Sequence, residues 1–156
     1  MSDSEIVMLI GLPASGKSTW RERYQNDAVV ISSDDMVEAY AVEHELNYSQ
    51  AFRAVDMKQL EKAMFEQYQQ AIAEGRYIII DRTNLNPKTR NRFLKDVPVN
   101  YRKVGVVFEV SDDELQQRLD KRAVETGKTI PAFVIDSMRT SYIAPTLEEF
   151  HEIRKA

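Results

Sequence analysis

The chain has 156 residues, of which 43% are hydrophobic and 29% charged, and its formal net charge is −4. This length suits one domain with one core, so we expect residues 1–156 to form a single domain. The lack of cysteine excludes disulfides, thiolate metal sites and cysteine nucleophiles. No apolar run approaches the ~20 residues of a membrane span, and the acidic charge argues against gripping long duplex DNA. We expect a cytoplasmic protein without a membrane segment.

Strand and helix patterns alternate along the chain. Near-continuous apolar runs predict strands at residues 6–10, 28–31, 77–81 and 104–110. Helices are predicted after residue 18, near residue 36, over 49–74 as one long or bent helix, over 86–95, and from Ser111, Pro131 and Pro145 onward. This alternation predicts an α/β fold, a three-layer sandwich with a mostly parallel sheet.

A phosphate-binding loop (P-loop, residues 11–18) follows the first predicted strand. It reads Gly-Leu-Pro-Ala-Ser-Gly-Lys-Ser, which completes the pattern G-x-x-x-x-G-K-[ST]. Backbone N–H groups and the next helix N-terminus surround phosphate oxygens in such a loop, while its lysine reaches the β- and γ-phosphates. We therefore predict that ATP is bound by Gly11, Pro13, Ala14, Ser15, Gly16, Lys17, Ser18 and Thr19, with the Ser18 hydroxyl on Mg²⁺.

Acidic residues end the next two predicted strands. Ligands of an open parallel sheet lie beyond the carboxyl ends of its strands. Asp34 is our candidate general base, because a carboxylate near an acceptor hydroxyl can take its proton. Alternatively, Asp34 and Asp35 only cap the helix that follows. Asp81 is a candidate for holding Mg²⁺ directly or through water, the alternative being an ordinary turn aspartate.

Two arginines predict a lid. Arg118 and Arg122 are four residues apart and so share one helix face. The segment 125–128 that follows has the composition of a mobile loop, and arginines beside such a loop suit closure over a triphosphate. We predict that both arginines bind ATP and act in catalysis. The alternative is a surface ion-pair face formed with Asp120 and Glu125.

A basic stretch spans residues 88–103, with six lysines and arginines and one acid. Within it Lys88 and Arg92 share a helix face. Such a stretch could bind a short or single-stranded nucleic acid, or could simply be a solvated helix face.

Together these motifs resemble the 5′-kinase domain of phage-type polynucleotide kinases. The resemblance is carried by residues 11–20, the paired aspartates within 32–35, and the segments 83–87, 108–122 and 131–142. It implies that the first aspartate is the base and that the 83–87 segment lies near the acceptor. We therefore expect Asp35, Arg82, Thr83, Asn84, Lys88 and Arg92 to bind the acceptor. The chain departs from the family at Val37, where an arginine normally holds a substrate phosphate, at Arg82 in place of an acid, and in a longer segment after Arg122.

The expected function is an ATP- and Mg²⁺-dependent kinase that phosphorylates a hydroxyl of a nucleic acid, with the 5′-OH of a polynucleotide favoured. Val37 leaves open a kinase for a hydroxymethylated base within DNA. The low isoelectric point leaves open a small-molecule kinase, and a non-enzymatic nucleotide-binding module is disfavoured because base, loop and lid are all present. A phage-encoded enzyme of this kind would act in the host-cell cytoplasm. No sequence feature specifies the oligomeric state.

Overall fold

The computed structural model of the chain describes residues 4–156. Its strands form one sheet in which every neighbouring pair is parallel, in the order β2-β3-β1-β4-β5. The strands are β1 (Glu5–Ile10), β2 (Val29–Ile31), β3 (Ile78–Asp81), β4 (Arg102–Val107) and β5 (Glu152–Lys155). The expected α/β architecture with a parallel sheet is confirmed.

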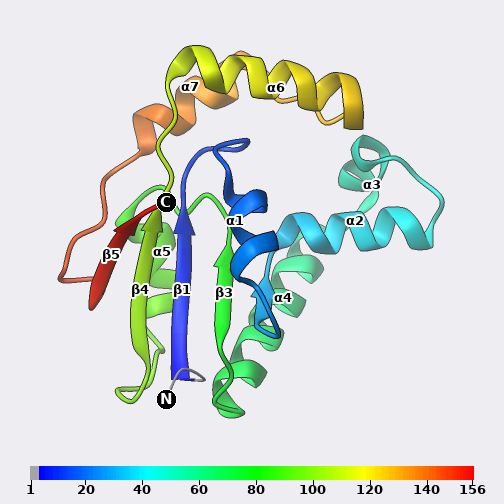
Figure 1. Cartoon of the computed structure of the whole chain (residues 1–156). Coiled ribbons are helices and arrows are strands. Elements are labelled where there is room, and N and C mark those ends of the chain that lie inside the picture. The colour runs from blue at the N-terminus through cyan, green and yellow to red at the C-terminus, as the bar shows by residue number, and fades with distance from the viewer. Residues whose placement is uncertain (1–3) are drawn as a thin grey trace.

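Helices cover both faces of the sheet. On one face lie α4 (Met57–Ala73) and α5 (Pro87–Leu94), and on the other lies α1 (Lys17–Tyr24) (Figure 1). Alternate residues of β1 serve the two layers: Met8 packs in one core cluster with Met64 and Phe93, whereas Leu9 packs in the other with Trp20. Because both faces are covered, the strands are continuously apolar.

The remaining helices lie around the carboxyl ends of the strands. Two of them, α6 (Asp112–Thr126) and α7 (Ala132–Ser141), pass over this edge of the sheet, and α2 (Ser33–Glu43) and α3 (Tyr48–Ala54) lie to one side of it (Figure 1). None of the helices within residues 4–156 is long and apolar enough to span a membrane.

Local capping explains several helix boundaries. Ser32 caps α2 by accepting a hydrogen bond from the Asp35 N–H, and Asn86 caps α5 with Pro87 at the first helical position. Gly75 follows α4 with a φ of 67°, which glycine adopts without steric cost. The predicted start of α5 is confirmed.

Three sequence-based expectations need correction. The single helix over 49–74 is two helices, because Val55 is extended and the Asp56 side chain caps α4. The fourth strand ends at Val107 rather than residue 110. Instead of a helix, a short turn follows Pro145 and leads into β5, which pairs with β4 at the sheet edge. That pairing is a tertiary interaction, and the sequence of β5 carries only one large apolar residue, Ile153.

Candidate active site

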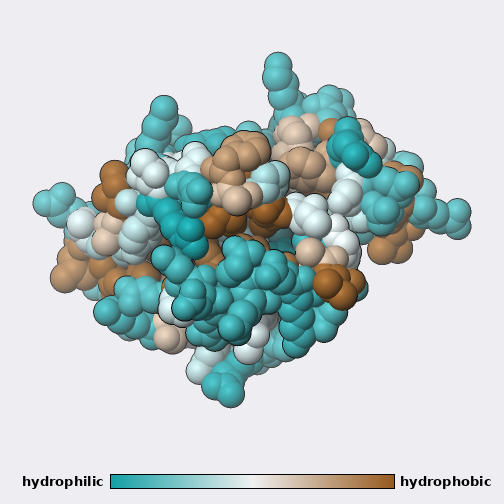
Figure 2. All heavy atoms as spheres, turned by 90° about the horizontal axis from the view of Figure 1, so that it is seen from above, coloured by the Kyte–Doolittle hydropathy of each residue, from teal (hydrophilic) through white to brown (hydrophobic). Residues whose placement is uncertain are grey.

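A cleft of about 1560 Å³ lies at the carboxyl edge of the sheet. Its walls come from the P-loop, the start of α2, α3, the end of β3, and the lid formed by α6, α7 and their connection. Viewed from the lid side, the surface is mainly hydrophilic, with smaller apolar patches between (Figure 2). This is the edge at which a parallel sheet presents its ligand site.

The P-loop is closely packed and tied to the sheet. A Cβ atom on Gly11 would lie 2.7 Å from Ser15 Oγ and 2.9 Å from Phe108 Cβ, so only glycine fits there. Gly16 has a φ of 111°, in the region that favours glycine. The Gly11 N–H donates to the carbonyl oxygen of Thr83, which anchors the loop to the segment after β3. The loop is therefore shaped before any ligand binds.

Two side chains of the P-loop fit a bound phosphate. Ser15 Oγ is buried and has no hydrogen-bond partner within residues 4–156, although a buried hydroxyl without a partner is costly. Lys17 Nζ donates to the carbonyl oxygens of Gly11 and Leu12, at 2.6 and 3.3 Å. A phosphate oxygen would give the Ser15 hydroxyl a partner and the lysine an anionic one.

Burial lowers the pKa of Lys17 to about 8. The charges of Asp81 and Asp34 raise that pKa in opposition, and the charge of Arg122 lowers it further. Burial therefore makes the ammonium form less favourable than it is in water, and a bound anion would offset that cost. A triphosphate supplies that anion, so the electrostatics of Lys17 fit nucleotide binding.

Arg21 joins two of the acids into a cluster. Its guanidinium forms two hydrogen bonds with Asp35, of 3.1 and 2.7 Å, and a third of 2.9 Å with Asp81 Oδ2. Hydrogen bonding to Asp35 is the main cause that raises the pKa of Arg21. Burial raises the pKa of Asp81, and the charges of Lys17 and Arg21 oppose that rise. Arg21 follows Lys17 by four residues in α1, a spacing that indicates one helix face, but our sequence analysis missed it.

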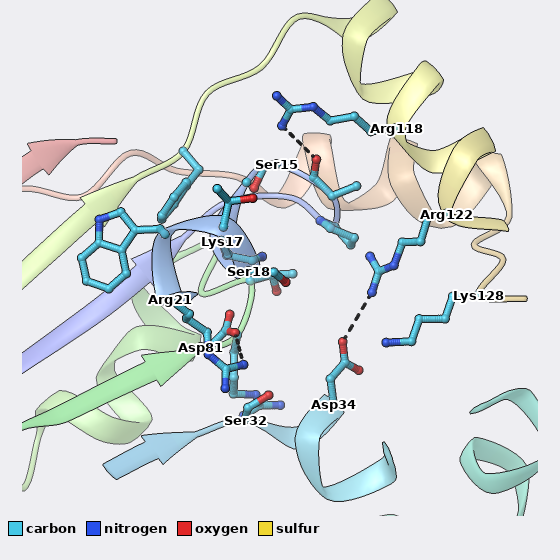
Figure 3. Close-up of a pocket in the computed structure, with 18 of the residues that line it drawn as sticks. Ser15, Lys17, Ser18, Arg21, Ser32, Asp34, Asp81, Arg118, Arg122 and Lys128 are labelled. Atoms are coloured by element: carbon cyan, nitrogen blue, oxygen red, sulfur yellow. Dashed lines mark hydrogen bonds and ion pairs between the residues drawn. The ribbon is translucent and has the colours of Figure 1, made fainter. Parts of the chain in front are cut away.

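Ser18 and Asp81, the two residues proposed to hold magnesium, line the same cleft. Ser18 is exposed to the cleft beside Lys17, and Asp81 lines the same cleft (Figure 3). Across the described chain, no three His, Cys, Asp or Glu side chains converge on a metal site. Because Mg²⁺ bound with nucleotide keeps waters and takes phosphate oxygens as ligands, a hydroxyl and one nearby carboxylate are a compatible set.

Asp34 is not the capping residue of α2, which was the role in the alternative interpretation. Ser32 caps α2, so the Asp34 carboxylate does not. Its Oδ1 accepts a hydrogen bond of 2.5 Å from the Tyr48 hydroxyl, and its Oδ2 lies 3.8 Å from Arg122 Nη2. The Asp34 side chain is 54% exposed and faces the cleft (Figure 3). Of the two adjacent acids, Asp34 is available to a substrate while Asp35 is held by Arg21.

The lid arginines both reach into the cleft. Arg118 donates to the carbonyl oxygen of Ala14 in the P-loop, at 3.3 Å, and also pairs with Glu114. Arg122 points at Asp34 (Figure 3). The two acids named in the alternative interact with other partners, Asp120 with Gln116 and Glu125 with Lys121, so the surface ion pair of Arg118 is the one with Glu114.

Part of the expected acceptor set lies elsewhere. Arg82 and Thr83 line the cleft, but Asn84, Lys88 and Arg92 do not. Asn84 is buried and donates to the carbonyl oxygens of Leu9 and Arg82. Lys88 and Arg92 lie on α5, a helix that covers a face of the sheet, and Arg92 pairs with Glu61. Our expectation that these three residues line the acceptor site is therefore not met.

Two further positions in α2 and α5 are core residues. Val37 is 1% exposed and packs with Ala41, Ala51 and Leu60. Arg90, from the basic stretch, is fully buried, and its guanidinium pairs with Glu149 and donates to the carbonyl oxygen of Asn84. The basic stretch is therefore partly structural.

The lid connection and α3 contribute residues that the sequence analysis did not single out. Lys128 forms an ion pair with Glu38 and lies 4.5 Å from the centre of the Tyr48 ring. Phe52 and Arg53 line the same side of the cleft. No phosphate-binding or catalytic pattern includes these residues, so only their place in the fold reveals them.

Known proteins share this fold and sequence pattern. The chain is 22% identical over 152 residues to heterogeneous nuclear ribonucleoprotein U-like protein 2 of Mus musculus, aligning 93% of this chain but spanning only 20% of that protein's length. It superposes with a TM-score of 0.66 on a provisionally assigned kinase from Chloroflexus aurantiacus, at 15% identity, covering 99% of this chain and 85% of the other. A chain of the Pnkp1/Rnl/Hen1 RNA repair complex gives a TM-score of 0.63 at 24% identity, covering 89% of this chain and 44% of the other.

These likenesses agree with the P-loop and the parallel sheet described above. A sequence profile described as "AAA domain" matches residues 6–145, from β1 to the segment after α7. The chain belongs to this AAA domain family, and its fold is a parallel sheet with a P-loop after the first strand.

Proposed function

We propose that this chain is an ATP-dependent kinase that transfers the γ-phosphoryl group to a hydroxyl of a nucleic acid, with the 5′-OH of a polynucleotide as the favoured acceptor. One observation carries the proposal: Oδ2 of Asp34 and the guanidinium of the lid's Arg122 face each other in the cleft that contains the P-loop. The charges of Asp34 and Arg122 both act on the Lys17 ammonium, so the three groups form one electrostatic unit.

Each residue has a role in the proposed transfer. Asp34 orients the acceptor hydroxyl and takes its proton as the new oxygen–phosphorus bond forms and the bond to the ADP leaving group breaks. Lys17, Arg118 and Arg122 neutralise charge on the phosphates during this step. Ser18, with Asp81 nearby, would hold Mg²⁺, which adds further charge neutralisation when bound.

Three findings support a nucleic acid acceptor. The ordered motifs resemble those of polynucleotide kinases, one structural neighbour belongs to an RNA repair complex, and one sequence relative is named as a ribonucleoprotein. We further propose that the enzyme acts in the cytoplasm on a short or single-stranded region.

A hydroxymethylated base within DNA is the second candidate acceptor. The observation that favours it is the burial of Val37, because α2 then offers no arginine to hold the phosphate that neighbours a terminal hydroxyl. A flipped base needs no such terminal contact. The two acceptors share the donor chemistry and differ only in the hydroxyl presented to Asp34.

The proposal is tested by incubating the protein with γ-labelled ATP, Mg²⁺ and a panel of acceptors. The panel contains 5′-OH oligonucleotides, the same oligonucleotides with a blocked 5′ end and internal hydroxymethyluracil, and free nucleosides and sugars. We expect label on the 5′-OH oligonucleotides and none with Lys17→Ala. Label confined to internal hydroxymethylated bases would select the second candidate, and label only on nucleosides or sugars would overturn the nucleic acid proposal.

A further inference from the structure

Two aromatic residues lie beside the candidate base, the partly buried Tyr48 and the exposed Phe52. Tyr48 and Phe52 are four residues apart on α3, with ring centres 6.2 Å apart and an interplanar angle of 26°. Phe52 is 50% exposed, and both residues line the cleft. A single exposed aromatic side chain is ordinary on a protein surface, but the Phe52 ring lies in the cleft rather than on the outer surface.

Tyr48 connects this aromatic pair to the candidate base, Asp34. The Tyr48 hydroxyl donates to Oδ1 of Asp34, which leaves Oδ2 facing Arg122 and the cleft. Phe52 is about one helical turn, roughly 6 Å, farther along α3. An acceptor whose 5′-hydroxyl meets Asp34 would therefore have the nucleobase on the same sugar within reach of the Phe52 ring.

Cationic groups flank the pair. Lys128 lies over the Tyr48 ring from the lid side. Arg53, the neighbour of Phe52, is exposed, and within the described chain it has no carboxylate within ion-pairing distance. An aromatic surface beside an unpaired arginine is the combination that binds single-stranded nucleic acid, through base stacking and phosphate contact.

We propose that Tyr48 and Phe52 form a stacking platform for the unpaired 5′-terminal nucleobase of the acceptor strand, with Arg53 on the backbone phosphate that follows. This inference rests on the proposed function and specifies its substrate class. It also explains how the acceptor is held although Val37 cannot supply a phosphate contact from α2. Single strands and 5′ overhangs should be better acceptors than blunt or recessed 5′ ends, because a paired base cannot leave its stack to reach the platform.

The test is a two-by-two comparison of protein and substrate. Wild type and Phe52→Ala are each assayed with a single-stranded 5′-OH oligonucleotide and with the same oligonucleotide lacking its 5′-terminal base. Stacking predicts that removing either the ring or the base raises the KM for the oligonucleotide about 5- to 100-fold, and that removing both costs little more. The KM for ATP should not change, and Phe52→Tyr should restore the KM for the oligonucleotide.

Phe133→Ala is the matched control. Phe133 is also an exposed phenylalanine on a helix, at 74% exposure, but it does not line the cleft. Its removal should leave both KM values unchanged. Equal KM values for the oligonucleotide in wild type and Phe52→Ala, or independent additive losses from ring and base, would overturn the platform while leaving the kinase proposal intact.

Equilibrium binding separates the platform from the kinase activity. A 3′-labelled single strand is titrated with wild type, Phe52→Ala and Phe133→Ala, and anisotropy is recorded. If the protein phosphorylates no oligonucleotide but Phe52→Ala alone weakens binding of the single strand, the platform is upheld and the proposed function is overturned. Absence of single-strand binding in the wild type would overturn the platform, and a Phe52-dependent dimer seen by sedimentation would assign the surface to a second copy of the chain instead.

Discussion

The two sides of the cleft are built differently. On the donor side, defined by the P-loop, Arg21 and Asp81, side chains are buried and joined by ion pairs: Arg21 and Asp81 are 17% and 12% exposed. On the acceptor side, defined by Asp34, Tyr48, Phe52 and Arg53, they are far more open, with Asp34 at 54% and Phe52 at 50%. In the proposed function, the donor side binds the triphosphate and the acceptor side determines which hydroxyl is phosphorylated.

The two sides of the cleft also differ in how widely their sequence patterns are shared among proteins. The donor side depends on a short sequence pattern that many P-loop proteins share, so fold and nucleotide binding are readily identified. The acceptor side depends on α2 and α3, where Val37 replaces the arginine of the resembled family. Mutations on the donor side should therefore affect every acceptor equally, whereas mutations on the acceptor side should discriminate among acceptors.

The largest effect is expected from Lys17→Ala. Lys17 carries the main side-chain charge on the transferring phosphate, so turnover should fall by about 10³-fold or more with every acceptor. Steady-state phosphorylation assays measure this, with circular dichroism and thermal unfolding as controls for the fold. A folded Lys17→Ala protein with normal turnover would contradict the P-loop assignment.

The lid arginines should have graded effects. Arg122→Ala removes the cation nearest Asp34 and should lower turnover about 10²-fold, while Arg118→Ala, whose contact is with the loop backbone, should lower it about tenfold. Both should weaken ground-state ATP binding less than turnover, as measured by calorimetry. Lys121→Ala, on the same helix but paired with Glu125, is the control, and it should behave like wild type.

ATP affinity should fall at alkaline pH. The pKa of Lys17 is about 8 without ligand, and bound phosphate raises it, so binding takes up a proton once the pH exceeds 8. Between pH 7 and pH 9 the Kd for ATP should therefore rise about tenfold, which calorimetry in buffers of different ionisation enthalpy can follow. Lys17→Arg stays charged, and a Kd that rises as steeply in that variant would show that another group is responsible.

The smallest effect is expected on α5. Because Lys88 and Arg92 lie outside the cleft, reversing both charges should change the KM for an oligonucleotide less than about twofold at moderate salt. Arg53→Glu, on the acceptor side, is the comparison variant and should raise the KM for the oligonucleotide several-fold. A large change in the α5 variant, with a weaker salt dependence, would restore the basic stretch as a nucleic acid site.

The sequence predicts the P-loop of the donor side because the information is local, although our sequence analysis missed Arg21. The apolar strand, the glycines and Lys17 lie within one short segment, and their spacing determines their geometry. Arg118 and Arg122 were predicted for a similar reason, since their helical spacing places them on one face. The choice of Asp34 over Asp35 as the base stays a prediction; in the structure Arg21 pairs with Asp35, whereas Asp34 faces the cleft.

The acceptor side could not be predicted because it depends on contacts distant in sequence. Tyr48 lies 14 residues from Asp34 in sequence and meets it where α3 packs beside α2. The division of residues 49–74 into α3 and α4 at Val55 is likewise not indicated by the apolar spacing. Arg90 belongs to a basic run, but its burial depends on Glu149, 59 residues away. The strand β5 likewise forms only because β4 offers an edge.

The most direct test of the account compares Asp34→Asn with Asp35→Asn. Asn keeps the size of the side chain but cannot take a proton, so Asp34→Asn should lower turnover on a 5′-OH oligonucleotide about 10²-fold or more while the Kd for ATP stays within a few-fold. Asp35→Asn should retain most turnover and instead lower the unfolding temperature by a few degrees, about the shift from losing ~1 kcal/mol of ion pairing to Arg21. The reverse outcome, an inactive Asp35→Asn beside an active Asp34→Asn, or full activity in both, would contradict the assignment of Asp34 as the base.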